Sequence, residues 1–129
     1  FNRALAYEFD YRCKQGGQLA SKMRFLSAPW VPMLRDGVGL RNAAHANRMA
    51  RRLEAGIRAI PSLPILFPSE ANSVFVAMPE PVRARVKELG WRFHDYPAVG
   101  GIRLMCAWDI TEDDVDGFLT DLRKAASAG

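Results

Sequence analysis

Three prolines, Pro61, Pro64 and Pro68, divide the sequence into two parts with different patterns. Proline fixes its own backbone φ angle and has no N–H to donate, so helix interiors and central strands avoid it. The apolar residues 65–67 between these prolines can form an edge strand at most. We therefore place a linker here, between a first region of residues 1–60 and a second region of residues 61–129.

The first region has helical periodicity at both ends. Residues 3–14 have loosely helical spacing up to Gly16-Gly17, because adjacent glycines are costly inside a helix. Residues 40–59 predict a long helix with small and apolar residues on one side and arginines on the other. The small residues favour close packing, and the arginines are typical of a solvated face.

A stripe of large apolar residues lies between these two segments and recurs every three or four positions, as on one side of a helix. Its members are Leu19, Met23, Leu26, Trp30 and Met33. Pro29 and Pro32 lie inside the same segment, so we expect the helix to kink or end near Ala28. The stripe predicts contact with a core or with another subunit.

The second region alternates strands with helices. Ser73–Met78 predicts a strand, and a short helix is expected between Pro81 and Gly90. Trp91–His94 and Ile102–Trp108 predict two further strands, and the acidic residues after Thr111 predict the start of a last helix. The order β-α-β-β-α predicts a small α/β (α+β) sandwich, with helices on one face of an antiparallel sheet.

Arg103 breaks the pattern of the strand 102–108. Ile102, Leu104, Cys106 and Trp108 alternate with Arg103, Met105 and Ala107, which is the period of a half-buried strand. The second, otherwise apolar face therefore begins with a guanidinium. From the residues alone, an arginine paired with an acid and an arginine that binds a ligand both fit.

Composition excludes several classes of protein. The 129 residues carry a formal charge of +4 and a sequence pI near 9.4, but the basic residues are dispersed among acidic ones, so we expect no nucleic-acid partner. No apolar run approaches the ~18 residues of a membrane span, and no signal peptide is visible. Cys13 and Cys106 lie far apart and read as reduced thiols of a cytoplasmic protein. Because the sequence begins at Phe1, we expect a longer parent chain.

The candidates for chemistry form no complete active site. His45 and His94 lie far apart, and neither has a carboxylate or cysteine at metal-ligand spacing, so we interpret both as structural and expect no metal. Asp113 and Asp114 fit a helix start better than a pair of catalytic acids. Neither Gly16-Gly17 nor Gly100-Gly101 forms a phosphate-binding loop.

Five segments, covering nearly the whole chain, carry a resemblance to a known family. They are YRCKQGGQLASKMRFLSAPW (11–30), GVGLRNAAHANRMARRLEAG (37–56), FPSEANSVFVAMP (67–79), GWRFHDY (90–96) and GIRLMCAWD (101–109). Together they resemble the C-terminal part of the low-specificity L-threonine aldolases. These enzymes belong to the β-eliminating lyase group of fold-type-I pyridoxal-phosphate enzymes.

The resemblance implies an aldolase that cleaves L-threonine or L-allo-threonine to glycine and acetaldehyde, as a homotetramer or dimer. Pyridoxal phosphate would be the electron sink. Residues 1–60 would form the end of the large domain, the linker and interface helices, and residues 61–129 the C-terminal small domain. The Schiff-base lysine would lie upstream of residue 1. We therefore expect no catalytic residue in this chain and no activity of the chain alone.

The resemblance also implies roles for three residues. Arg103 would bind the substrate α-carboxylate, since a guanidinium offers a planar pair of donors, and Gly100 and Gly101 would let the backbone pass close to the ligand. Lys14 and Arg24 would lie near the cofactor or the neighbouring subunit's site, with interface electrostatics as the alternative. Two other functions stay open: another amino-acid lyase of the same fold, and a non-catalytic basic interaction module.

Overall fold

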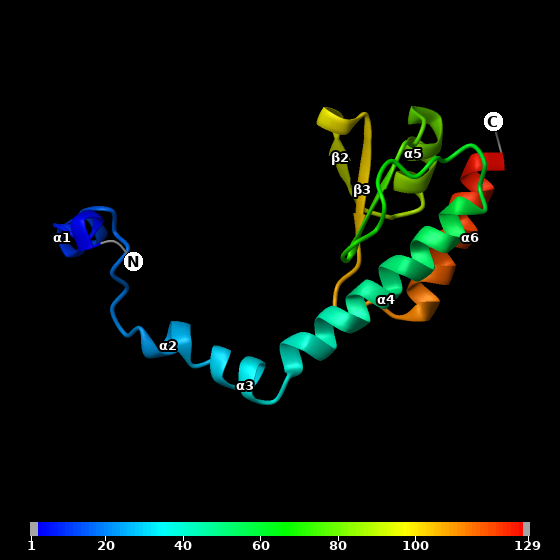
Figure 1. Ribbon diagram of the computed structural model, residues 1–129. Helices are drawn as coiled ribbons and strands as arrows, with labels where there is room; N and C mark the ends of the chain where they lie inside the picture. Colours follow the sequence, from blue (N-terminus) through cyan, green and yellow to red (C-terminus); the bar gives the residue numbers. More distant parts are fainter. Residues whose placement is uncertain (1–2, 128–129) are drawn as a thin grey trace. The chain divides into compact units, whose positions relative to one another are not determined.

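The computed structural model describes residues 3–127, apart from the side chains of Leu5 and Val99. The chain divides into two compact units, Phe1–Val38 (unit 1) and Gly39–Gly129 (unit 2). Helix α4, Val38–Arg58, begins at the last residue of unit 1 and continues through unit 2 (Figure 1). Four of its residues, Met49, Ala50, Leu53 and Ile57, share one core with buried residues between Ile60 and Ala125. The expected boundary between a large and a small domain near residue 60 stays a prediction.

Unit 1 consists of short helical segments. They are the 3-10 helix η1 (Arg3–Leu5) and the α-helices α1 (Phe9–Gln15), α2 (Arg24–Ser27) and α3 (Trp30–Arg35). The apolar stripe predicted a helix from its first residue onwards, and this is wrong for the residues before Arg24. Lys22 has a left-handed backbone (φ 60°), and regular helix begins only at Arg24. The predicted break near Ala28 is confirmed, because α2 ends at Ser27 and α3 begins at Trp30.

The apolar side chains of unit 1 are exposed in this chain. Among its described residues none is buried, and every member of the stripe from Leu19 to Met33 lies at least 40% exposed. Exposed apolar surface of this kind is typical of an interaction site. The contact that the stripe predicts, with a core or with another subunit, stays a prediction.

Unit 2 contains a three-stranded antiparallel sheet in the order β1-β3-β2. Its strands are β1 (Ser73–Val76), β2 (His94–Tyr96) and β3 (Gly101–Met105), and a 3-10 helix η2 (Pro97–Val99) connects β2 to β3. The register pairs Phe75 with Arg103 and His94 with Arg103. The predicted edge strand at 65–67 is reduced to one bridge, between Ile65 and Val76, as the flanking prolines require.

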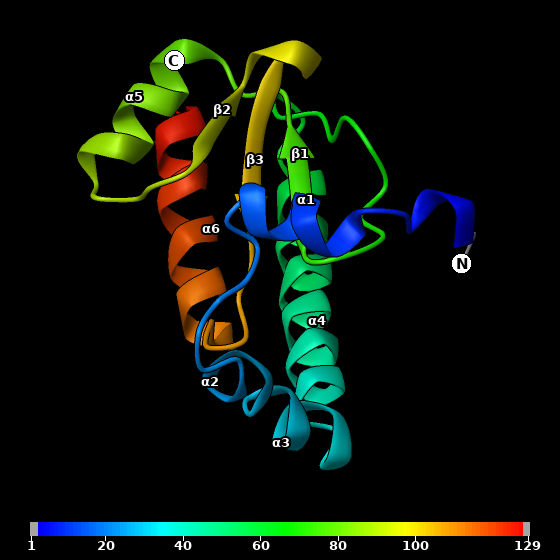
Figure 2. The same ribbon diagram turned by 90° about the vertical axis from the view of Figure 1, so that its left-hand side faces the viewer.

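Helices α4, α5 (Glu80–Glu88) and α6 (Glu112–Ser127) pack on one face of this sheet (Figure 2). Val74 and Val76 of β1 and Ile102 and Leu104 of β3 alternate along their strands, so they point to the same side, and all four are buried with residues of the three helices. The predicted α+β class, element order and one-sided arrangement of helices are confirmed. No helix within residues 3–127 is both long and apolar enough to cross a membrane.

Two strands differ from their predicted bounds. β2 occupies 94–96 and not 91–94, because Trp91 serves another contact: its ring packs edge-on against Phe118 at 5.1 Å, and its indole N–H donates to Asp121 (3.0 Å). β3 ends at Met105, three residues before the predicted end. The expected start of α6 is confirmed, since Thr111 and Asp114 cap it reciprocally through backbone and side-chain hydrogen bonds.

Candidate functional site

The site begins with the second face of the sheet, which points away from the three helices. Residues opposite each other in an antiparallel ladder share a face, so Phe75, His94 and Arg103 lie together there, and Tyr96 joins them two residues beyond His94. We call this surface, made of Phe75, His94, Tyr96 and Arg103, the Arg103 face. It is the side of the sheet that the core leaves free.

Arg103 is half-buried on this face, and no acid among the described residues pairs with it. Its Nε is buried, and no group within the described part of the chain accepts a hydrogen bond from it. The guanidinium carbon lies 5.8 Å from the centre of the Tyr96 ring, which is within the range of a cation–π contact. A buried donor without an acceptor costs about 1–3 kcal/mol. Within residues 3–127, Arg103 therefore has a buried donor that no acceptor uses.

Aromatic rings extend from Arg103 across this face. The Tyr96 ring contacts Phe75 edge-on at 5.7 Å, and Phe75 contacts Phe67 in the same way at 5.6 Å. This row of rings was not predicted from the sequence. Alternation within SVFV and within HDY shows which residues of one strand share a face. It does not show the register between strands, which brings Phe75 and Tyr96 to Arg103.

Some arginines of unit 2, such as Arg52 and Arg58, are paired with acids. Arg52 donates two hydrogen bonds to Asp116, of 2.9 and 2.7 Å, and lies 3.0 Å from Glu112. The hydrogen bond from Arg52 lowers the pKa of Asp116. Arg58 pairs with Glu54 one helical turn away. One alternative for Arg103 was an arginine paired with an acid. Arg52 and Arg58 are paired in this way, whereas no acid within the described chain pairs with Arg103.

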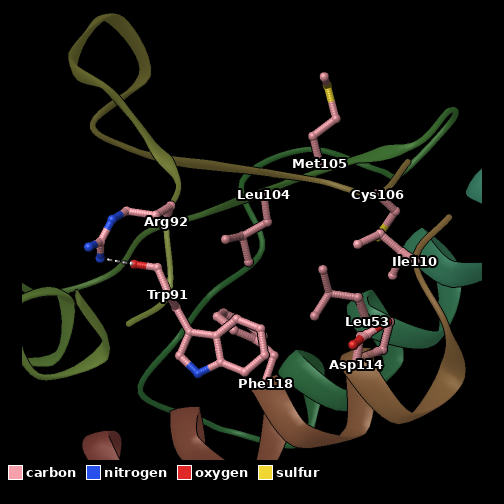
Figure 3. Close-up of a pocket in the computed structure, with 10 residues that line it drawn as sticks. Leu53, Trp91, Arg92, Leu104, Met105, Cys106, Ile110, Asp114 and Phe118 are labelled. Atoms are coloured by element: carbon pink, nitrogen blue, oxygen red, sulfur yellow. Dashed lines mark hydrogen bonds between the residues drawn. The ribbon is translucent and has the colours of Figure 1, made fainter. Parts of the chain in front are cut away.

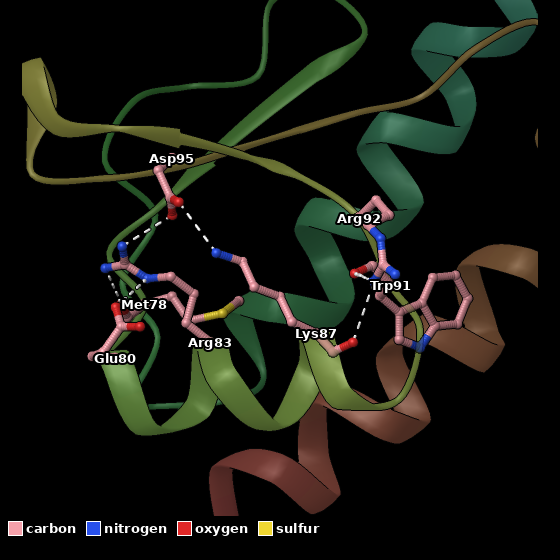
Figure 4. A network of polar contacts seen from close by, with 7 residues as sticks. All are labelled: Met78, Glu80, Arg83, Lys87, Trp91, Arg92 and Asp95. Carbon is pink, nitrogen blue, oxygen red and sulfur yellow. Dashed lines mark hydrogen bonds and ion pairs between the residues drawn. The ribbon is translucent and has the colours of Figure 1, made fainter.

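Arg83 shows the same pairing on the opposite side of β2 (Figure 4). Its terminal nitrogens donate to Asp95 (3.0 Å) and to the Met78 carbonyl (2.9 Å), and its Nε lies 3.4 Å from Glu80 at an ion-pair distance without hydrogen-bond alignment. Lys87 also donates to Asp95 (3.2 Å). The hydrogen bonds from Lys87 and Arg83 lower the pKa of Asp95. This network ties α5 to the edge strand.

A cavity of about 140 Å³ lies among β3, α4 and α6, on the helix side of the sheet (Figure 3). Its polar lining residues are already engaged: Arg92 donates to the carbonyls of Lys87 and Trp91, and Asp114 accepts from Thr111. Burial raises the pKa of the Cys106 thiol in its wall, which keeps that thiol protonated and unreactive. The cavity therefore offers packing space and no free reactive group among its described residues.

The two histidines have different surroundings. His45 donates from Nε2 to the Ile110 carbonyl (2.7 Å) and accepts at Nδ1 from Arg48 (3.3 Å), so its structural interpretation is confirmed. His94 is exposed on the Arg103 face. Within the described chain, no three histidine, cysteine or acidic side chains come together as metal ligands would.

Lys14 and Arg24 lie in unit 1. Lys14 is exposed near the end of α1, and Arg24 is the first residue of α2, where its guanidinium carbon lies 6.0 Å from the centre of the Phe25 ring. Their roles near the cofactor or a neighbouring subunit stay predictions, as does that of Arg103.

The backbone and the packing of the chain itself explain why residues 100 and 101 are glycines. Gly100 has a left-handed backbone (φ +70°) that closes η2, a conformation glycine adopts without cost. A methyl group on Gly101 would lie 2.5 Å from the Val76 carbonyl oxygen, so no side chain fits there. The fold thus requires both glycines without any ligand.

Fold and site together define a class: an α+β domain with three helices on one sheet face and, on the other, a half-buried arginine with no acid partner among the described residues. Comparison with known proteins then points to particular relatives. Over 128 residues, 99% of this chain, it is 53% identical to a low specificity L-threonine aldolase of a Pseudomonas species and 49% identical to one of Pseudomonas aeruginosa. No protein-family model matches.

The chain spans 37% of the length of each of these relatives. Across that portion the similarity is continuous, and the resemblance drawn from the sequence is confirmed: the chain is homologous to part of the low specificity L-threonine aldolases.

Proposed function

We propose that this chain is the carboxylate-binding part of a pyridoxal-phosphate-dependent aldolase that cleaves L-threonine and L-allo-threonine to glycine and acetaldehyde. Relatives named low specificity L-threonine aldolase, at 53% and 49% identity, support the reaction class. The observation that carries the role of this part is the Arg103 guanidinium, which no acid of the described chain neutralises.

Arg103 would bind and orient the amino acid. Its planar guanidinium matches the geometry of a carboxylate with two parallel N–H donors. The rings of Tyr96 and Phe75 flank it and lower the local polarity, which strengthens such a charge-assisted contact. With its carboxylate held, the amino acid has a defined rotation about Cα, and that rotation decides which bond at Cα is aligned for cleavage.

Pyridoxal phosphate, when bound, supplies the electron sink for the carbanion left after Cα–Cβ cleavage. The lysines of unit 2 fit structural roles and not cofactor attachment, because Lys87 pairs with Asp95 and Lys124 with Asp121. We place the attachment lysine outside this chain and expect the chain alone to be inactive. Borohydride reduction of the chain with pyridoxal phosphate should leave no stoichiometric label by mass spectrometry, whereas full labelling of one lysine would contradict this.

Self-association belongs to the same proposal. The exposed apolar stripe of unit 1 supports a homodimer or homotetramer in which Lys14 and Arg24 approach a neighbouring subunit's site. Sedimentation of the complete protein should give a dimer or tetramer, and glutamate at both Leu26 and Trp30 should shift it toward monomer. A complete protein that is monomeric before substitution would contradict this part.

The reaction itself is tested on the complete protein. Purified with pyridoxal phosphate, it should release acetaldehyde and glycine in equal amounts from L-threonine. Release of a keto acid and ammonia would identify another lyase of the same fold. A protein that neither binds the cofactor nor turns over amino acids would identify an interaction module.

A further inference from the structure

On the Arg103 face, the aromatic ring of Tyr96 lies beside the guanidinium, and no acid among the described residues does. Tyr96 lies opposite Gly101 in the ladder, and Arg103 is two residues further along the same face of β3. Diagonal neighbours of this kind are within reach of an aromatic ring. Gly101 contributes no side chain, and the Tyr96 ring centre lies 5.8 Å from the Arg103 guanidinium carbon.

The Tyr96 ring is itself restrained. Three rings follow one another across the face. Phe75 packs edge-on against Tyr96 with ring centres 5.7 Å apart, and Phe67 packs edge-on against Phe75 with ring centres 5.6 Å apart. Edge-to-face pairs prefer this geometry, so each ring limits the rotation of the next. Tyr96 therefore presents its face to Arg103 from a supported position.

The kind of contact decides what remains available on Arg103. An acid partner uses the in-plane N–H donors, as Asp116 does with Arg52. A ring below the guanidinium restrains it through its face and leaves those in-plane donors free. A long arginine side chain otherwise loses rotamer entropy when a ligand immobilises it.

We propose that Tyr96 is a positioning residue for Arg103: its ring holds the guanidinium in place while leaving the in-plane donors free for the substrate carboxylate. This inference rests on the proposed function of Arg103. The ring, and not the hydroxyl, performs this role. Tyr96→Phe should therefore keep this positioning role, and Tyr96→Leu should lose it.

The test uses the complete enzyme, with KM for L-threonine and calorimetric binding of glycine as readouts. Tyr96→Leu should weaken both about 3- to 10-fold while kcat changes less than 2-fold, and Tyr96→Phe should stay within about 2-fold of wild type. Phe93→Leu is the matched control. It removes a ring of the neighbouring segment that lies against Lys87 (5.3 Å) and takes no part in the Tyr96 row, so both readouts should stay within about 2-fold.

A double variant separates positioning from folding. In an Arg103→Ala background, Tyr96→Leu should add no further loss, because the group it positions is gone. An equal loss in both backgrounds, or wild-type affinity in Tyr96→Leu, would overturn the inference. If Arg103→Ala alone left affinity unchanged, the proposed function of Arg103 would fail first, so the two failures are distinguishable.

Discussion

The arginines on the two sides of the β2–β3 pair differ in whether their N–H donors have acceptors. On the helix side, Arg83 donates from both terminal nitrogens to fixed acceptors, Asp95 and the Met78 carbonyl. On the other side, Arg103 has an aromatic ring against it and no acceptor among the described residues. The difference shows that burial and charge alone do not identify a binding arginine. Whether its donors are already used decides between a structural role and a ligand-binding one.

The largest effect is expected at Arg103 in the complete enzyme. Arg103→Ala removes a charge-assisted contact worth roughly 1.5–3 kcal/mol, so amino-acid affinity should fall about 10- to 150-fold. Arg103→Lys should recover only part of this, because an ammonium keeps the charge and loses the planar fork. Steady-state kinetics with L-threonine measures both variants, and cofactor titration serves as the control, since cofactor affinity should hardly change.

A converse effect is expected at Arg83. Arg83→Ala removes one of the two side chains that link α5 to Asp95 of β2, the other being Lys87, and leaves the Met78 carbonyl without this donor. The lost hydrogen bond to that carbonyl should cost about 1 kcal/mol of stability. Chemical denaturation should show the loss, while KM for L-threonine stays unchanged. If Arg83→Ala instead raised KM tenfold with normal stability, the assignment of roles to the two faces would be reversed.

The smallest effect concerns pH. Lys87 and Arg83 lower the pKa of Asp95 below its ordinary value of 3.8. A carboxylate whose pKa is lowered by folding contributes stability above its unfolded pKa and loses it as pH falls through the folded pKa. Stability should therefore decrease below about pH 4, and Asp95→Asn should decrease less steeply there. Identical acid slopes for both proteins would show that Asp95 does not contribute.

Strong periodicity made much of unit 2 predictable. The long helix near residues 40–59 and the order β-α-β-β-α follow from patterns within single segments, and both were confirmed. The helix predicted from the apolar stripe was wrong before Arg24, because Lys22 adopts a left-handed backbone, whereas its predicted break near Ala28 was confirmed. β2 was misplaced because Trp91 has the composition of a strand residue but packs against Phe118 of α6.

The candidate site was predictable only in part. Arg103 could be singled out because a guanidinium interrupts an apolar alternation within one strand. Its neighbours could not, because the register that places Phe75 and Tyr96 beside it depends on pairing between strands far apart in sequence. That no acid within residues 3–127 pairs with Arg103 likewise depends on how the chain packs.

One measurement tests the central claim most directly: inhibition of the complete enzyme by glycine and by glycinamide, which lacks the carboxylate charge. Wild type and Arg83→Ala should both prefer glycine by about tenfold or more, and Arg103→Ala should bind the two ligands equally. A preference for glycine that persisted undiminished in Arg103→Ala would contradict the claim that Arg103 binds the carboxylate.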